Sequence, residues 1–152
     1  MNKYIVGIVT LFLLIIVGFS GCASTTDAST IDPDDDPEIK SNLPIILFKP
    51  DSTELTAGED ERVLELIDML KQAGEGSFLI IGHSADVGRP EGQQKLSEER
   101  AASIAQRLIA GGILPGAIRY EGRGATDPVA DNTTAQGRAQ NRRVEVEVTI
   151  LN

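Results

Sequence analysis

An arginine lies where a predicted helix should present only apolar side chains. Residues 90–110 have the composition of a helix, and Leu96, Ile104 and Leu108 fall on one of its faces. At about 100° per residue, Arg100 lies between Leu96 and Ile104, inside this apolar stripe. An arginine in such a place extends to solvent, pairs with an internal acid, or faces a pocket that binds an anion. Arg100 is therefore a candidate anion-binding residue, although its position alone leaves all three explanations open.

Further charged side chains stand at the ends of predicted strands. Arg142 and Arg143 come directly before the last strand, where alternation directs their side chains to opposite faces. One of the two is expected on the face that the helices cover, and the simpler explanation of the pair is surface charge that balances nearby glutamates. Asp51 follows the first predicted strand and Asp86 follows the second. Because loops after strands often carry ligand sites, both aspartates are candidates as well.

The only histidine has no partner in the sequence for catalysis or metal binding. His83 follows an apolar run and lies in the segment Gly-His-Ser-Ala-Asp-Val-Gly at residues 82–88. No nucleophile is paired with it, and the chain has a single cysteine and no second histidine to complete a metal site. We therefore expect a protein that is not an enzyme and that uses neither a metal nor a cofactor.

The first half of the predicted fold is a strand, a helix and a second strand. Residues 43–48 and 77–81 are short apolar runs typical of strands, and the second run lacks alternation, so both of its faces should be covered. Residues 56–59 have the spacing of a capping box, and a helix should follow them until Gly74. The apolar residues with helical spacing are Val63, Leu66, Ile67 and Leu70.

The second half repeats the pattern of helix and strand. The helix over residues 90–110 should end at the Gly-Gly pair that follows it, and a brief strand should cover residues 118–121. Residues 122–137 are rich in Gly, Asp, Asn and Thr and are predicted to form a long loop. Strict alternation over residues 144–150 predicts a half-buried last strand. The order β-α-β-α-β-β predicts an α/β fold, an α+β sandwich with the helices packed on one face of the sheet.

The N-terminal part of the chain has a different composition. Residues 1–21 combine a positive start, an apolar run and small residues before Cys22, as in a cleaved secretory signal peptide. The lone cysteine after Ser-Gly is similar to the lipobox of bacterial lipoproteins, in which that cysteine is lipidated. Phe19 stands where leucine is usual, and a plain signal peptide is the alternative. Residues 22–42 are acidic and polar, so we expect a flexible linker before a domain at residues 43–152.

The charge of the chain argues against a nucleic-acid partner. The formal net charge is -9, and removal of Lys3 with the signal peptide makes it one unit more negative. Binding to phosphates needs a basic face, and tryptophan, which stacks well on bases, is absent.

Short motifs occur in a fixed order along residues 43–151. They are Gly82-His83-Ser84, Gly88, Leu96-Ser97, Arg100-Ala101, Gly122-Arg123-Gly124, Pro128, Asn132-Thr133-Thr134, Gly137-Arg138 and Asn141-Arg142-Arg143-Val144-Glu145. Their order and spacing resemble the OmpA-like peptidoglycan-binding domain, and with the lipobox the chain resembles the peptidoglycan-associated lipoprotein type. The resemblance implies a mixed sheet covered by helices, no enzymatic activity, and a loop-shaping role for His83.

The resemblance also implies a binding site. Members of that family hold the far end of a diaminopimelate of the peptidoglycan stem peptide, which carries one ammonium and one carboxylate. By the resemblance, Arg100 binds the carboxylate, a role that suits a planar and permanently charged guanidinium, and Arg142 and Asp51 line the same pocket. Further candidates that the motifs supply are Ser84, Gln93 and Asn141.

Ala85 departs from the family motif, Gly-His-Thr-Asp, whose aspartate takes the ammonium of the ligand. This chain has Ala85 where that aspartate is expected. Three explanations follow: Asp86 or Asp51 supplies the carboxylate, the wall contains another diamino acid, or peptidoglycan binding is lost while the fold serves another role.

These observations predict a lipid-anchored, non-enzymatic envelope protein that tethers a membrane, through Cys22, to the peptidoglycan stem peptide. Because no aspartate follows the cysteine directly, the periplasmic face of the outer membrane is the expected location. The alternative is a degenerate domain that binds other envelope proteins and no longer binds peptidoglycan.

Overall fold

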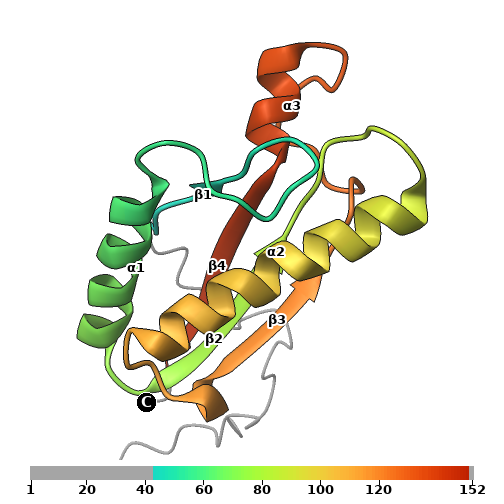
Figure 1. Ribbon diagram of the computed structural model, residues 1–152. Helices are drawn as coiled ribbons and strands as arrows, with labels where there is room; N and C mark the ends of the chain where they lie inside the picture. Colours follow the sequence, from blue (N-terminus) through green and yellow to red (C-terminus); the bar gives the residue numbers. More distant parts are fainter. Residues whose placement is uncertain (1–42, 151–152) are drawn as a thin grey trace, which may run out of the picture. The chain divides into compact units, whose positions relative to one another are not determined.

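The structure, a computed structural model, describes residues 43–150. The signal peptide, the lipidated cysteine and the linker predicted within residues 1–42 lie outside the described residues. Strands and helices alternate along the described chain, as Figure 1 shows. In chain order they are β1 (Ile46–Leu47), α1 (Glu59–Ala73), β2 (Gly76–Gly82), α2 (Pro90–Ala110), the short 3-10 turn η1 (Pro115–Ala117), β3 (Ile118–Gly122), α3 (Ala135–Asn141) and β4 (Arg143–Ile150).

The strands form one mixed sheet in the order β1-β4-β2-β3. β4 runs antiparallel to both of its neighbours, β1 and β2, whereas β3 runs parallel to β2. A parallel pair needs a crossover connection, and α2 supplies it between β2 and β3. In the register, Phe78 of β2 lies between Ile118 of β3 and Val148 of β4. The mixed sheet that the resemblance implies is therefore confirmed.

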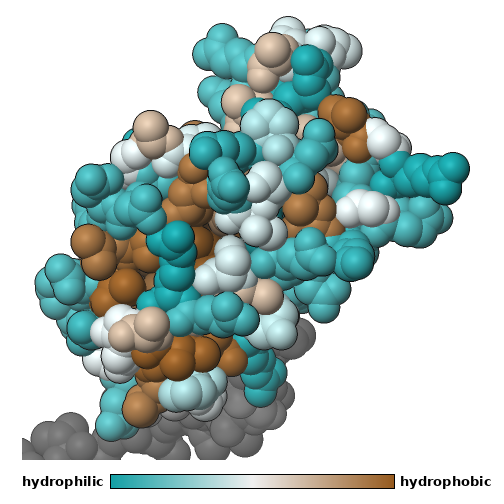
Figure 2. All heavy atoms as spheres, in the orientation of Figure 1, coloured by the Kyte–Doolittle hydropathy of each residue, from teal (hydrophilic) through white to brown (hydrophobic). Residues whose placement is uncertain are grey.

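The two long helices cover the same face of the sheet, as predicted (Figure 1). The apolar stripe of α1 and the apolar residues of α2 meet the inward-facing residues of β1, β2 and β4 in one hydrophobic core. Figure 2 shows hydrophobic side chains at the surface near α1 and the C-terminal end of α2. Leu64 of α1 and Leu114, which follows α2, are both exposed. No helix in residues 43–150 has both the length and the apolar character needed to cross a membrane.

Two glycines allow α2 to lie very close to the sheet. A Cβ atom at Gly82 would overlap the backbone carbonyl of Ser97, and one at Gly122 would overlap the Ser97 hydroxyl. Ser97 is fully buried, and its hydroxyl donates to the Gln94 carbonyl at 2.7 Å and accepts from the Gly124 N–H at 2.9 Å. Because side chains here would push the layers apart, the two glycines fix how close α2, which carries Arg100, lies to the sheet.

The last helix, α3, corrects the predicted loop over residues 122–137. Thr134 caps this helix, and its hydroxyl accepts a hydrogen bond from the Gly137 N–H at 2.9 Å. The helix is only seven residues long, and it has no apolar stripe. Periodicity could not reveal it, because it is held by its cap and by polar contacts rather than by a buried apolar face.

The start of α1 also differs from the prediction. Gly58 stands at the N-cap with φ of 86°, and no side chain caps the helix, so the predicted capping box is wrong. Glu59 is buried instead, and its carboxylate accepts a hydrogen bond from the Leu47 N–H at 3.1 Å. That bond ties α1 to β1, whose regular pairing covers only Ile46–Leu47 rather than residues 43–48.

Candidate functional site

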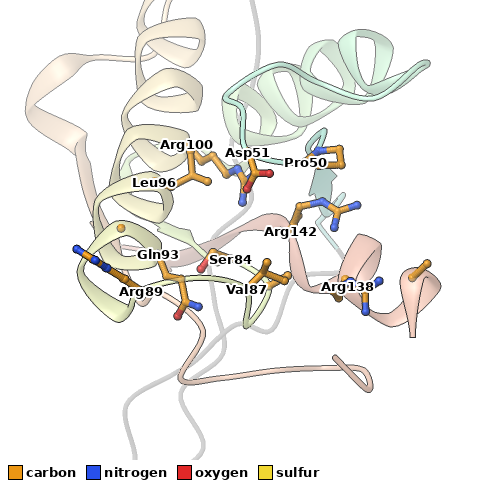
Figure 3. Close-up of a pocket in the computed structure, with 13 residues that line it drawn as sticks. Pro50, Asp51, Ser84, Val87, Arg89, Gln93, Leu96, Arg100, Arg138 and Arg142 are labelled. Atoms are coloured by element: carbon orange, nitrogen blue, oxygen red, sulfur yellow. The ribbon is translucent and has the colours of Figure 1, made fainter. Parts of the chain in front are cut away.

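A pocket of about 540 Å³ opens where four segments meet, as Figure 3 shows. They are the loop after β1, the loop after β2, the N-terminal half of α2, and α3 with the residue that follows it. The pocket has the volume of a small-molecule site. Its lining residues are Pro50, Asp51, Ser84, Ala85, Val87, Arg89, Gly92, Gln93, Leu96, Arg100, Ala135, Arg138 and Arg142.

Arg100 is fully buried at this pocket and is bonded to backbone carbonyls. Its Nε donates to the Ser52 oxygen at 3.0 Å, Nη1 to the His83 oxygen at 3.2 Å and Nη2 to the Lys49 oxygen at 3.0 Å. The guanidinium carbon lies 5.4 Å from the centre of the Phe48 ring, within the range of a cation–π interaction. The arginine therefore joins the loop after β1 to the end of β2, and no carboxylate of residues 43–150 pairs with it within 4.0 Å.

The positive charges of the guanidinium groups at the pocket repel one another. Burial, and next the charge of Arg142, lower the pKa of Arg100 to about 10, while Asp51 acts in the opposite direction. Burial also lowers the pKa of Arg142, and Arg138 adds to this effect while Asp51 again opposes it. Positive charges thus converge on a partly desolvated site, where an anion would be stabilised.

α3 and the residue that follows it supply two of these arginines, Arg138 and Arg142, one helical turn apart. Nη1 of Arg138 donates to the carbonyl oxygens of Asn132 and Thr133, at 2.8 and 3.0 Å. Nε of Arg142 donates to the Phe48 carbonyl oxygen at 3.3 Å. Because each guanidinium has five N–H donors, both side chains keep donors for a ligand.

Asp51 is the only acidic side chain among the residues that line the pocket. Its φ of 46° places it in the left-handed region, which aspartate tolerates better than most residues. Figure 3 shows its carboxylate between the side chains of Arg100 and Arg142. Asp51 therefore partly compensates the charge of both arginines.

The loop after β2 brings Ser84 and Ala85 to the pocket but directs Asp86 elsewhere. Ser84 is 4% exposed, and its hydroxyl has no hydrogen-bond partner within the described part of the chain. Oδ1 of Asp86 accepts a hydrogen bond from Nε2 of Gln93 at 3.2 Å, and the Asp86 N–H donates to Oδ1 of Asn132 at 3.1 Å. Asp86 lines an adjoining groove rather than the arginine-lined pocket, whereas Gln93 lines both.

Asn141 lies apart from the pocket and is bonded to the preceding loop. It is fully buried, and its Oδ1 accepts from the N–H groups of Val129 and Ala130 at 2.9 and 3.0 Å. Its Nδ2 donates to the Ala130 carbonyl and to Oδ1 of Asn132, each at 2.8 Å. These bonds shape residues 129–132, and Asn141 does not line the pocket.

Arg143 and His83 occupy the other face of the sheet. Val144 belongs to the core, so alternation places Arg143 on the face away from the helices, where it pairs with Glu145. His83 is 1% exposed, and neither of its ring nitrogens has a hydrogen-bond partner among the described residues. Burial, and next the charge of Arg143, lower its pKa to about 4. His83 is therefore neutral at pH 7 and lies inside the fold as a loop residue.

The structure thus brings together Arg100, Arg142, Asp51, Ser84 and Gln93, and it places Asp86 and Asn141 outside the pocket. Arg89 and Arg138 also line the pocket, and no pattern in the sequence predicted them as site residues. Arg138 precedes Arg142 by four residues, a helical spacing that would have been informative had α3 been recognised. Residues 43–150 contain no group of three or more His, Cys, Asp or Glu side chains that could hold a metal ion.

Comparison with known proteins agrees with this fold. A model described as "OmpA family" matches residues 47–142. Outer membrane protein A of Bordetella avium is 40% identical over 88 residues, which are 55% of this chain and 45% of that protein. Peptidoglycan-binding protein ArfA of Mycobacterium tuberculosis is 34% identical over 103 residues, 68% of this chain and 32% of that protein. The chain therefore spans less than half the length of each of these relatives.

A solved structure shares the arrangement of helices and strands. The crystal structure of the peptidoglycan-associated lipoprotein from Burkholderia pseudomallei superposes with a TM-score of 0.64 and 23% sequence identity. The match covers 68% of this chain and 88% of that chain. At this level of identity the likeness supports the fold.

Proposed function

The chain belongs to the OmpA family, and we propose that its arginine-lined pocket binds a carboxylate of the diamino acid in the peptidoglycan stem peptide. The protein would act without catalysis, as a tether between a membrane and the cell wall. The observation that carries this proposal is the group of four arginines, none paired with a carboxylate of residues 43–150 within 4.0 Å. They are Arg89, Arg100, Arg138 and Arg142.

Binding of an anionic ligand explains this group of cations better than a purely structural role does. Arg100 uses three of its five N–H donors on carbonyl oxygens, so two remain, and Arg142 retains further donors beside it. A carboxylate there would accept charge-assisted hydrogen bonds and relieve the repulsion between the two guanidiniums. The hydroxyl of Ser84 and the amide of Gln93 would complete the polar contacts.

The anchor of the tether would be Cys22. Signal peptidase cleavage would leave this cysteine at the mature N-terminus, where lipidation would hold the protein at the periplasmic face of the outer membrane. Residues 22–42 would then form the linker, with a random-coil span of roughly 25 Å. A Cys22→Ser variant should lose incorporation of labelled palmitate in cells and should leave the membrane fraction. Retention of both would contradict the anchor.

Sedimentation with insoluble peptidoglycan tests the binding site. We expect Arg142→Gln to weaken binding by about ten- to a hundred-fold, because it removes charge-assisted hydrogen bonds at the pocket. Arg123→Gln is the matched control, since Arg123 pairs with Glu121 at 2.9 Å on the other face of the sheet. Equal binding of the wild type and both variants would exclude this pocket as the wall-binding site, and no sedimentation of the wild type would exclude wall binding.

A second function is favoured by Ala85, which brings a methyl group to the pocket where the family motif has a carboxylate. The domain would then bind another envelope protein and not the wall. Absence of peptidoglycan binding, together with specific cross-linking of the full-length protein to an envelope protein in cells, would support this function over the first.

A further inference from the structure

The charge of the pocket is strongly unbalanced. Among its lining residues, four guanidinium groups face a single carboxylate, that of Asp51 (Figure 3). Asp51 already offsets the charges of both Arg100 and Arg142, which lie on either side of it. A ligand that brings a further positive charge into this pocket would meet repulsion from the guanidiniums, and among the lining residues only Asp51, which already offsets two of them, could compensate it.

The side of the pocket formed by the loop after β2 offers no second acid. Ala85 is 7% exposed and presents a methyl group, and Val87 beside it is apolar. The nearest acid in the sequence, Asp86, is bonded to Gln93 and lines the adjoining groove. Pro50 and Leu96 add to the apolar part of the lining. This part of the pocket is therefore suited to a neutral group and not to an ammonium.

The remaining arginines extend the site beyond Arg100 and Arg142. Arg89 stands at the N-cap of α2, where a cation is unfavourable beside the positive end of the helix dipole unless an anion is near. Figure 3 shows Arg89 and Arg138 on opposite sides of the pocket, with Arg100 and Arg142 between them. The hydroxyl of Ser84, buried and without a partner in the described residues, is a further donor.

From this geometry we infer that the pocket selects a diamino acid whose side-chain amine is acylated, over one with a free ammonium. Acylation turns the ammonium into a neutral amide and leaves the adjacent carboxylate unchanged. The carboxylate then binds the arginines, while the acyl group lies against Ala85 and Val87. A cavity of about 540 Å³ has room for both groups. In a cell wall, the acylated form is the diamino acid whose amine has been consumed in a cross-link. This inference rests on the proposed function, because it specifies the ligand of the same pocket.

Two tripeptides of the stem type test the inference. One is L-alanyl-γ-D-glutamyl-diaminopimelate with the free side-chain amine, and the other is the same peptide with that amine acetylated. Isothermal titration of the full-length protein in detergent should show at least tenfold tighter binding of the acetylated peptide. Ala85→Asp should reverse the preference, because it adds a carboxylate for the ammonium, whereas Ala85→Ser, similar in size and neutral, should keep it.

The outcomes separate this inference from the proposed function. Equal affinity for the two peptides, or tighter binding of the free amine by the wild-type protein, would overturn the inference and leave wall binding intact. Binding of neither peptide, together with no sedimentation with peptidoglycan, would overturn both. Sedimentation with peptidoglycan but binding of neither peptide would overturn the inference, since the acylated diamino acid would not be the recognised group. The wild-type comparison stands even where Ala85→Asp fails to fold.

Discussion

Arginines gather on both faces of the sheet, but their partners differ. On the face away from the helices, Arg123 lies 2.9 Å from a carboxylate oxygen of Glu121, and Arg143 pairs with Glu145. Around the pocket, Arg100 and Arg142 donate to neutral carbonyl oxygens, and Asp51 alone offsets their charge at a longer distance. Paired arginines need no ligand, whereas partly buried and unpaired ones are typical of a site that an anion completes.

The charges of the two buried arginines, Arg143 and Arg100, are also compensated in different ways. Arg143 is 2% exposed, and it has a carboxylate partner to compensate its charge. Arg100 is 0% exposed, and its charge is met by the dipoles of three carbonyls and the face of the Phe48 ring. The protein therefore uses Arg100 both to connect its loops and to keep a positive charge at the pocket.

Replacement of Arg100 should have the largest effect on stability. Arg100→Met should lower the free energy of unfolding by about 3–5 kcal/mol, because the buried carbonyls of Lys49, Ser52 and His83 would lose their donors. Arg143→Met, on the other face, should cost roughly half as much, since its partner Glu145 can be solvated. Urea denaturation of the two variants measures the difference. An Arg100→Met protein as stable as wild type would show that the carbonyl contacts contribute little.

The buried His83 should make stability depend on acid pH. Its pKa is about 4 in the fold and about 6.5 in an unfolded chain, so between these values the unfolded state binds more protons. Burial of the neutral His83 therefore does not reduce stability above about pH 7. The free energy of unfolding should fall by on the order of 3 kcal/mol as the pH falls from 6.5 to 4, because the unfolded chain then binds a proton that the fold excludes.

His83→Leu should remove the part of this pH dependence that arises from the imidazole. The part that arises from carboxylates should remain. Urea denaturation of both proteins at pH 7 and pH 4.5 gives the difference. An NMR titration of His83 in the wild type measures its pKa directly, and a value near 6.5 would contradict a neutral buried imidazole.

Loss of the Asp51 carboxylate should have a smaller effect. It should lower the stability of the protein but tighten the binding of a carboxylate ligand. Asp51→Asn should destabilise the protein by about 0.5–1 kcal/mol, because Arg100 and Arg142 lose their only nearby counter-charge among the lining residues. Asparagine also adopts the left-handed conformation of Asp51, so the backbone should be kept. The same change should tighten binding of a carboxylate ligand several-fold.

Thermal unfolding and titration with the acetylated tripeptide measure the two effects. Asp68→Asn, an exposed acid in the middle of α1 that forms no ion pair within residues 43–150, is the control and should change neither by more than experimental error. Weaker ligand binding by Asp51→Asn would show that Asp51 contacts the ligand directly.

The exposed ion pair on the far face should matter least. Arg123 and Glu121 are 39% and 45% exposed, so their pairing should contribute less than about 0.5 kcal/mol in a double-mutant cycle. Urea denaturation of Arg123→Gln, Glu121→Gln and the double variant gives this coupling energy. A coupling above 1 kcal/mol would mean that the face acts as a connected charge network, and the contrast between the two groups of arginines would be weaker.

The sequence by itself determined the features that depend on local periodicity. The bounds of α2 and the alternation of β4 follow from apolar spacing, and the order of the elements predicted both long helices on one face of the sheet. All of these agree with the structure. The same spacing identified Arg100 as an exception within an apolar stripe. Periodicity suffices here because each of these elements buries a continuous face, and that face must recur in the sequence.

Only the tertiary structure shows which hydrogen bonds hold the polar side chains in place. Arg100 bonds to carbonyls that lie 17 to 51 residues away in the chain, and no local pattern encodes those contacts. α3 buries no apolar face, so periodicity could not assign its arginine, Arg138, to the pocket. Asp86 was a candidate because it stands next to Ala85, yet its bond to Gln93 directs it into the adjoining groove. The direction of a side chain in a loop depends on the contacts that hold the loop, and these come from distant parts of the chain.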